Sequence, residues 1–179
     1  IGPTLQFEEG GKICITGGDF RPLLEGRPLS NWKAEDVKKG NILSFKGRKS
    51  GARIYIAFQG GISKSILDNV MGSVSTYIPG GFGGIGGRPL KRGDEMFLDD
   101  AISEVPKITI TPPDSLPETV NLRIIPGPQD NLFREDALNV LTNSIYSVSI
   151  SSNRVGIRLD GPSISHEKRA DVISDGTAF

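Results

Sequence analysis

Three residue types that build many catalytic and metal sites are scarce in this sequence of 179 residues, which has one cysteine, one histidine and one tryptophan. With Cys14 alone, no internal disulfide can form, so we expect a reducing compartment and a Cys14 that acts as a small buried apolar residue. One histidine and one cysteine cannot supply the four ligands of a zinc site, and no loop has the ligands for calcium or magnesium. We therefore expect no metal.

An excess of charge of one sign and long apolar runs are also lacking. Lysine and arginine together number 21, as do aspartate and glutamate, so no net charge attracts nucleic acid or an anionic membrane. No stretch approaches the roughly 20 apolar residues that cross a bilayer. The first residues, IGPTLQF, have no basic segment or cleavage pattern of a secretory leader. These absences predict a soluble, cytoplasmic protein with neither nucleic-acid nor membrane partners.

Much of the sequence consists of short segments rich in β-branched residues, which glycines and prolines separate. The sequence contains 23 glycines and 12 prolines, and its apolar runs include KICITG, ARIYIAFQGG, KITIT, VNLRIIPG and YSVSIS. In one of them Ile54, Ile56 and Phe58 alternate with Tyr55 and Ala57, as in a half-buried antiparallel strand. The pattern predicts an all-β protein, with strands in a barrel or sandwich.

One convincing helix is expected at residues 131–146, where four apolar side chains share a face and Asp130 or Asn131 can cap the first turn. The apolar face consists of Phe133, Ala137, Val140 and Leu141. A weaker helix is expected within residues 62–74, which contain a glycine and several serines.

A proline-rich polar segment, residues 104–120, has the composition of a connector between domains. We place a domain boundary near Pro106, which divides the chain into units 1–105 and 106–179.

Two stretches repeat one design, VKKGNILSF at residues 37–45 and LKRGDEMFL at residues 90–98. In each, an apolar residue, two basic residues and a Gly-Asn or Gly-Asp turn precede a segment with apolar residues. We interpret both as entries into strands whose basic residues are solvated.

The segment PGGFGGIGGRPLKRGD contains Gly81, Gly83 and Gly86, which match the spacing of a dinucleotide-binding fingerprint. That fingerprint requires a helix directly after the glycines, because the amides of the helix N-terminus hold the pyrophosphate. Here Pro89 and further glycines oppose a helix. We expect this loop to bind neither NAD nor FAD.

Polar side chains that could act on a small amide gather late in the chain: Gln129, Arg154, Arg158, His166, Asp171 and Asp175. Arginine and amide groups can stabilise an oxyanion while a carboxylate or imidazole moves a proton. Each also has a structural interpretation, since His166 and Arg158 can face solvent and SDGT can form an Asx turn. A serine hydrolase is disfavoured because no G-x-S-x-G motif is present.

Six motifs in order carry a resemblance to a known family: YIAFQGGI, GSVST, GGFGGIGGRPLKRGD, GPQDNLF, SNRVGIRLDGP and DVISDGT. Together they resemble the family of 5-oxoprolinase C subunits, also described as biotin-dependent carboxyltransferase-like or allophanate hydrolase subunit 2-like. The family usually has arginines where this chain has Val74 and Pro79. Its members extend beyond both ends of this chain, so we expect part of the family's site to lie outside it.

The resemblance implies two cyclophilin-like β-barrels and an ATP-dependent 5-oxoprolinase that opens 5-oxoproline to glutamate. It implies two partners, a B-like protein related to kinase inhibitors and an A-like protein that opens the lactam, with ATP used by the complex. One alternative is a carboxyltransferase of a biotin-dependent urea carboxylase. Another is a regulatory protein that antagonises a histidine-kinase inhibitor.

Within this frame we assign catalytic roles to His166, Arg154 and Asp175. Substrate binding is assigned to Arg88, Gln129, Ser174 and Thr177. We expect the side chains of the late motifs to converge on one cleft near the interface between the two halves.

Overall fold

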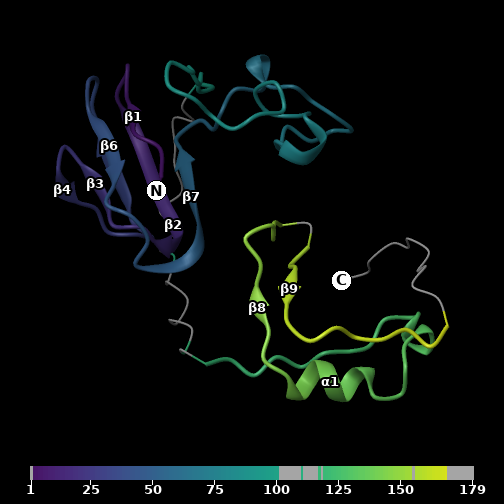
Figure 1. The fold of residues 1–179 in the computed structure, drawn as a ribbon. Coiled ribbons are helices and arrows are strands. Elements are labelled where there is room, and N and C mark those ends of the chain that lie inside the picture. Colours follow the sequence, from purple (N-terminus) through teal and green to yellow (C-terminus); the bar gives the residue numbers. More distant parts are fainter. Residues whose placement is uncertain (1, 101–109, 111–116, 118, 155, 169–179) are drawn as a thin grey trace. The chain divides into compact units, whose positions relative to one another are not determined.

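The computed structural model describes residues 2–100, 110, 117, 119–154 and 156–168 (Figure 1). The chain divides into two compact units, Ile1–Ser115 and Leu116–Phe179. The expected boundary near Pro106 lies outside the described residues and stays a prediction. The fold is mainly β, as the β-branched segments predict.

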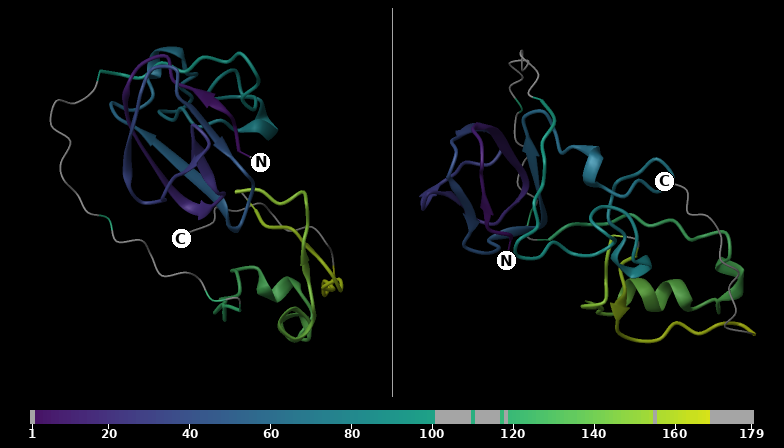
Figure 2. Two further views of the ribbon diagram at one scale, coloured as in Figure 1. Left: turned by 90° about the vertical axis from the view of Figure 1, so that its left-hand side faces the viewer. Right: turned by 90° about the horizontal axis from the view of Figure 1, so that it is seen from above.

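Seven strands of the first unit form two antiparallel sheets. In the right-hand view of Figure 2 they lie around a common centre. No ladder between the described strands joins the two sheets into a closed barrel. One sheet has the order β1-β6-β3-β4, formed by Leu5–Gln6, Ile42–Phe45, Pro22–Leu24 and Arg27–Pro28. The other has the order β5-β2-β7, formed by Ala34–Val37, Gly11–Asp19 and Ser50–Phe58.

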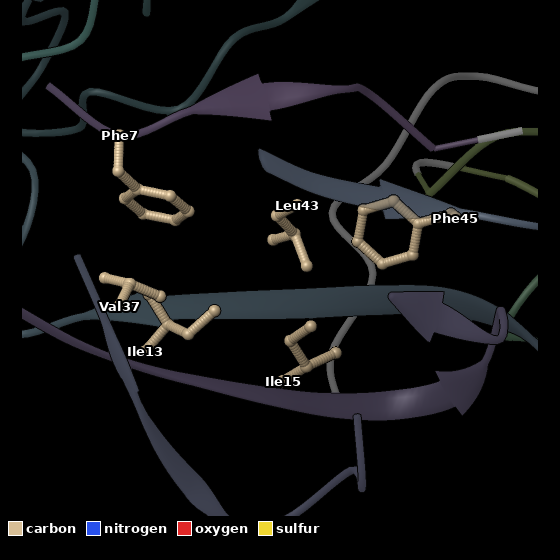
Figure 3. Packing of buried hydrophobic residues seen from close by; sticks show 6 residues of the cluster. All are labelled: Phe7, Ile13, Ile15, Val37, Leu43 and Phe45. Atoms are coloured by element: carbon tan, nitrogen blue, oxygen red, sulfur yellow. The ribbon is translucent and has the colours of Figure 1, made fainter. Parts of the chain in front are cut away.

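A small apolar core fills the space between the two sheets (Figure 3). Leu43 of β6 is fully buried, and it pairs across the ladder with Leu5 of β1. On the facing sheet, Ile13 and Ile15 of β2 are each 2 % exposed. The cluster of buried side chains consists of Phe7, Ile13, Ile15, Val37, Leu43 and Phe45. Burial of these apolar groups stabilises the first unit.

The period-two pattern of β7 is confirmed. Ile54, Ile56 and Phe58 pack against the core, whereas Tyr55 between them is 56 % exposed. Alternation also explains why the expectation for Cys14 is wrong: this residue follows Ile13 on β2, its side chain therefore lies on the opposite face, and it is only half-buried.

The glycine-rich segment forms a compact loop, and no helix follows it within the described residues up to 100. Its backbone bonds to the preceding segment, with the Asp68 N–H donating to the carbonyl of Gly84 over 2.7 Å. A Cβ at Gly87 would overlap backbone atoms of Gly81 and Phe82. The glycines therefore permit close packing of backbone on backbone.

Both copies of the repeated turn have the expected shape, but they lead to different structures. The first runs from Lys38 to Asn41 and enters strand β6. The second runs from Lys91 to Asp94 and leads to an isolated bridge at Leu98. The weaker helix expected within residues 62–74 is reduced to one 3₁₀ turn, Lys64–Ile66.

The second unit contains the helix α1 (Ala137–Asn143) and the hairpin of β8 (Ser147–Val148) and β9 (Leu159–Asp160) (Figure 1). The helix expected over residues 131–146 is therefore wrong in extent. No helix in the described part of the chain is long and apolar enough to cross a membrane.

The expected helix is shorter because Phe133 belongs to another interaction. Asp130–Leu132 form a 3₁₀ turn, and Phe133 then adopts an extended conformation. Its backbone forms an antiparallel bridge with His166, which lies 33 residues later. This pairing satisfies the backbone groups that a longer helix would have used. Asp136 takes the N-cap position in place of Asp130 or Asn131.

Candidate functional site

The only histidine is held by a two-stranded contact in the second unit. The Arg134 N–H donates to the carbonyl of Ser165 over 3.1 Å, and the Glu167 N–H donates to the carbonyl of Leu132 over 2.9 Å. The ring of His166 lies on Phe133, with centroids 4.5 Å apart and planes inclined by 30°. The imidazole is thus fixed by backbone pairing and by an aromatic neighbour.

One nitrogen of this imidazole has no hydrogen-bond partner in the described part of the chain. Nδ1 of His166 is inaccessible to solvent and unpaired. Buried polar atoms are normally hydrogen-bonded, so an unpaired one calls for a specific explanation. An imidazole nitrogen in this state can accept or donate a proton when a partner reaches it.

Gln129 lies directly before the same contact. It precedes the 3₁₀ turn Asp130–Leu132, and its carbonyl accepts a hydrogen bond from the Leu132 N–H over 3.1 Å. Its side chain is half-buried and makes no hydrogen bond with the described residues. The turn that carries this amide is therefore joined directly to Phe133, the residue that stacks on the imidazole.

Arg154 has a different environment, in the connection between β8 and β9. The base of this connection is closed by Ser152, whose hydroxyl accepts from the Arg158 N–H over 2.9 Å and donates to the carbonyl of the same residue over 3.1 Å. Arg154 itself is exposed, and its guanidinium forms no ion pair or hydrogen bond with the described residues. It is available to a ligand but is not held in one position.

The remaining late residues, Ser174, Asp175 and Thr177, lie outside the described residues, as does Asp171. Among the described members, no hydrogen bond or ion pair joins Gln129, Arg154 or His166 to another of the three. The expected convergence on one cleft therefore stays a prediction. Phe133, whose ring lies against His166, was indicated by the sequence only as part of a helix face.

In the first unit, Arg88 is clamped by a carboxylate. Its Nη1 lies 2.7 Å from Oδ2 of Asp94 and its Nη2 lies 2.8 Å from Oδ1, a bidentate ion pair. Asp94 also accepts a hydrogen bond from the Lys91 N–H over 2.8 Å. The Asp94 side chain is only 12 % exposed, whereas that of Arg88 is 35 % exposed. The sequence motifs indicated Arg88 but not its partner.

Arg88 lines a hollow of about 260 Å³ in the first unit. Its other walls are mostly apolar: Ile62, Leu67, Val74, Thr76, Ile78, Gly84, Ile85, Pro89, Leu90 and Met96. Pockets for drug-sized ligands measure roughly 300–1,000 Å³, so this hollow suits a small molecule. A guanidinium at an apolar wall can hold one polar group while the walls contact carbon atoms.

The hydrogen bonds from Arg88 and from the Lys91 backbone hold the pKa of Asp94 well below its usual range. The same pairing raises the pKa of Arg88. Because the pKa of Asp94 is depressed by folding, the ion pair contributes stability above the unfolded carboxyl value of about 3.9. That contribution declines as the pH falls below the unfolded value, and it is lost once the pH has fallen through the lower folded pKa.

We therefore expect the Arg88–Asp94 pair to persist when the pH is lowered from 7 to 3. The measurement is a carbon-13 NMR titration of side-chain carboxyl groups, in which Asp94→Asn identifies the signal by its loss. An Asp94 carboxyl that titrates near pH 4 would contradict the prediction.

No group of three or more histidine, cysteine, aspartate or glutamate residues that could hold a metal occurs in the described part of the chain. The arrangement found there offers organic groups instead: an unpaired imidazole nitrogen at His166, an exposed guanidinium at Arg154 and a clamped guanidinium at Arg88. Such groups move protons and stabilise negative charge on oxygen.

Comparison with known proteins gives consistent matches. A family model described as carboxyltransferase domain, subdomain A and B, matches residues 1–179. Urea amidolyase of Saccharomyces cerevisiae is 31% identical over 173 residues, which are 90% of this chain and 9% of that protein. The 5-oxoprolinase C subunit of Escherichia coli is 30% identical over 174 residues, 97% of this chain and 54% of the relative.

A solved structure agrees with these matches. The crystal structure of Kluyveromyces lactis urea carboxylase superposes with a TM-score of 0.69 at 30% identity, covering 92% of this chain and 16% of that chain. The chain thus spans about half the length of the 5-oxoprolinase relative and a much smaller share of the urea enzymes.

Proposed function

The chain belongs to the family of carboxyltransferase domains, subdomain A and B, and from this premise we propose that it is part of an ATP-dependent 5-oxoprolinase. In this activity the lactam of 5-oxoproline is opened to glutamate. One observation carries the proposal: the match to a 5-oxoprolinase C subunit extends over 97% of this chain and more than half of the relative. Of the proteins related to this chain, one is named as an enzyme, urea amidolyase, and one as a subunit of an enzyme, 5-oxoprolinase.

Lactam opening requires activation of a carbonyl that amide resonance protects from water. We assign to Arg154 the stabilisation of negative charge on the carbonyl oxygen, since its guanidinium is unengaged by the described residues. His166 is assigned proton transfer through its unpaired Nδ1. Asp175 is proposed as the carboxylate that assists it. Arg88, Gln129, Ser174 and Thr177 are proposed to bind substrate.

Partner proteins and ATP enter this proposal at the level of a complex. Two relatives are named as C subunits of 5-oxoprolinase, which supports an assembly with other components. We propose that these are a B-like protein related to kinase inhibitors and an A-like protein that opens the lactam. ATP would activate the carbonyl by phosphorylation, a step for which the sequence of this chain has no phosphate-binding motif.

A second function has equal support from the comparisons. The chain is 31% identical to a urea amidolyase and superposes on a urea carboxylase. In that case it would pass a carboxyl group from carboxybiotin to the nitrogen of urea, with biotin as the cofactor of the complex. Both reactions place charge on an amide oxygen, so the residues assigned above would keep their roles.

We expect the isolated full-length protein to have no turnover, and activity to appear only with its partners. Loss of one oxyanion contact changes a rate by roughly 10²–10³, and a general acid or base contributes roughly 10²–10⁴. The two contributions multiply to roughly 10⁴–10⁷, which reaches only the lower end of the roughly 10⁶–10¹⁷ by which complete enzymes accelerate reactions. The assay measures glutamate released from 5-oxoproline and ATP, with the protein alone and with both partners.

The variants His166→Ala and Arg154→Ala should each lower the rate of the complete mixture by about 10²-fold or more. Glu167→Ala is the matched control, because Glu167 is exposed and contributes only its backbone N–H to the contact with Leu132. Turnover by the isolated protein would contradict the need for a complex. Carboxylation of urea by the protein with a biotin carboxylase and biotin carrier, without glutamate release from 5-oxoproline, would favour the second function.

A further inference from the structure

The two copies of the repeated turn have the same hydrogen bonds. In the first, the Lys38 N–H donates to Oδ1 of Asn41 over 2.9 Å, and the Asn41 N–H donates to the Lys38 carbonyl over 3.0 Å. In the second, the Lys91 N–H donates to Oδ2 of Asp94 over 2.8 Å, and the Asp94 N–H donates to the Lys91 carbonyl over 3.2 Å. One side-chain oxygen at the fourth position is therefore enough to close either turn.

The second copy differs in having a carboxylate where the first has an amide. Asn41 shows that the turn does not need a negative charge. The turn therefore does not account for the charge of Asp94, and the ion pair with Arg88 does. Asp94 closes a turn and fixes a guanidinium at the same time.

The clamp uses only part of the guanidinium. Arginine has five N–H donors, two on each Nη and one on Nε. Arg88 uses both donors of Nη1, for Asp94 and for the carbonyl of Pro89 at 3.0 Å, and one donor of Nη2. The second donor of Nη2 and the Nε–H have no partner among the described residues. These two lie along one edge of the plane, parallel to each other, and can hold one acceptor group between them.

The charge balance indicates the kind of acceptor. Asp94 already neutralises Arg88, so a second carboxylate at the free edge would add an uncompensated negative charge beside the first. A neutral carbonyl oxygen adds none, and it still receives hydrogen bonds from a charged donor. The mostly apolar walls of the hollow suit the carbon atoms of such a molecule.

We propose that the free edge of Arg88 binds the carbonyl oxygen of a small planar amide in this hollow, with Asp94 as a positioning residue. The inference rests on the proposed function in one respect, that the substrate is an amide. It adds the atom that Arg88 recognises, the edge of the guanidinium that does so and the residue that fixes it.

Nitrogen-15 NMR of the Arg88 Nε–H in the full-length protein tests the proposal, with Arg88→Lys used to assign the signal. Three probes separate the chemistry: 2-pyrrolidone is a lactam without a carboxylate, cyclopentanecarboxylate is a carboxylate without a lactam, and 5-oxoproline has both groups. We expect 2-pyrrolidone and 5-oxoproline to shift the Arg88 signal saturably. No shift with 2-pyrrolidone at solubility-limited concentration would overturn the proposal.

The variant Asp94→Asn tests whether the ligand is a neutral amide or an anion, because the two should change in affinity in opposite directions. The variant keeps the oxygen that closes the turn, as Asn41 does, but lacks the charge that holds Arg88. For a neutral amide, loss of positioning should weaken 2-pyrrolidone binding at least tenfold. For an anion, the release of the arginine charge should instead strengthen binding. Unchanged 2-pyrrolidone affinity would therefore overturn the assignment, as would binding of cyclopentanecarboxylate at least as tight as that of 2-pyrrolidone while Asp94 is intact.

Asn41→Asp is the matched control, since it introduces the same carboxylate into the turn that has no arginine, and it should leave the affinity for 2-pyrrolidone unchanged. An unaltered backbone amide spectrum shows that each variant is folded, and Arg88→Lys preserves the Asp94 turn if Asp94→Asn does not fold.

The assay of the complete complex distinguishes this inference from the proposed function. Turnover of 5-oxoproline that Arg88→Lys and Asp94→Asn leave unchanged would overturn this inference and the substrate-binding role of Arg88, but not the proposed activity. Saturable 2-pyrrolidone binding at Arg88 without such turnover would overturn the proposed function alone.

Discussion

Replacing Leu43 by alanine is expected to lower the free energy of unfolding of the first unit by about 2–5 kcal/mol. Leu43 is the one side chain with no exposure at all in the cluster between the two sheets. The substitution removes buried methyl groups and leaves a cavity in their place. The strands cannot move in to close this cavity, because β6 is held in ladders with β1 and β3. A small core makes this loss a large part of the stability of the unit.

The sole tryptophan provides the measurement. Trp32 lies in the first unit, where its backbone N–H donates to the carbonyl of Ile15 over 2.7 Å, so its fluorescence in urea reports on the unfolding of this unit. Ile42→Ala is the control, because Ile42 is the neighbour of Leu43 on β6 and is 43 % exposed. It should cost about 1 kcal/mol. Equal losses for the two variants would show that Leu43 has no special place in the core.

Gly87→Ala is expected to destabilise the glycine-rich loop by about 2–5 kcal/mol, the sum of a left-handed backbone penalty and of overpacking. Gly87 has a φ of +64°, and a Cβ there would overlap backbone atoms of Gly81 and Phe82. Backbone atoms cannot rotate away as a flexible side chain would, so the loop has to open. The opening free energy can be measured by hydrogen exchange at the amides of Asp68 and Tyr77, which are bonded to the loop.

The adjacent glycine separates the two contributions. Gly86 has a similar φ of +60°, but a Cβ at this position has no atom within 4 Å. Gly86→Ala should therefore show only the left-handed penalty of about 1–2 kcal/mol. If both alanine variants lost the same amount, the close approach at Gly87 would be without energetic weight.

Local pattern was enough to predict β2, β6 and β7 of the first unit, but not the short strands β1, β3, β4 and β5. The alternation at Ile54, Ile56 and Phe58 reflects a physical constraint, since side chains two apart on a strand share one face. The same rule, applied to Cys14 between Ile13 and Ile15, would have placed it off the core face. The composition of the KICITG run suggested burial for all three residues alike.

The helix of the second unit could not be delimited in this way. Phe133 continues the apolar face in the sequence, yet a bridge to His166 holds it in an extended conformation. A contact between residues so far apart leaves no periodic signal in a single sequence. The outcome shows tertiary pairing overriding local propensity.

The sequence indicated only part of the candidate site. His166 and Arg88 stand out by residue type and motif, but their partners are set by geometry. From the sequence, Asp94 has only a position in a turn, the same position that Asn41 has in the other copy. The one indication in the sequence was that a carboxylate, Asp94, replaces the amide of Asn41 at the matching position. Its role becomes clear only from the structure, in which Arg88 forms an ion pair with Asp94.

The order of strands in the first unit has a consequence for synthesis of the protein. β2 ends at Asp19, whereas its ladder partner β7 ends at Phe58, 39 residues later (58 − 19). Ribosomes add about 5–20 residues per second, so β2 waits roughly 2–8 s for this partner. Folds dominated by such distant pairings also have high contact order and fold slowly. During that interval β2, with its buried residues Ile13 and Ile15, lacks the strand that completes its sheet on one side.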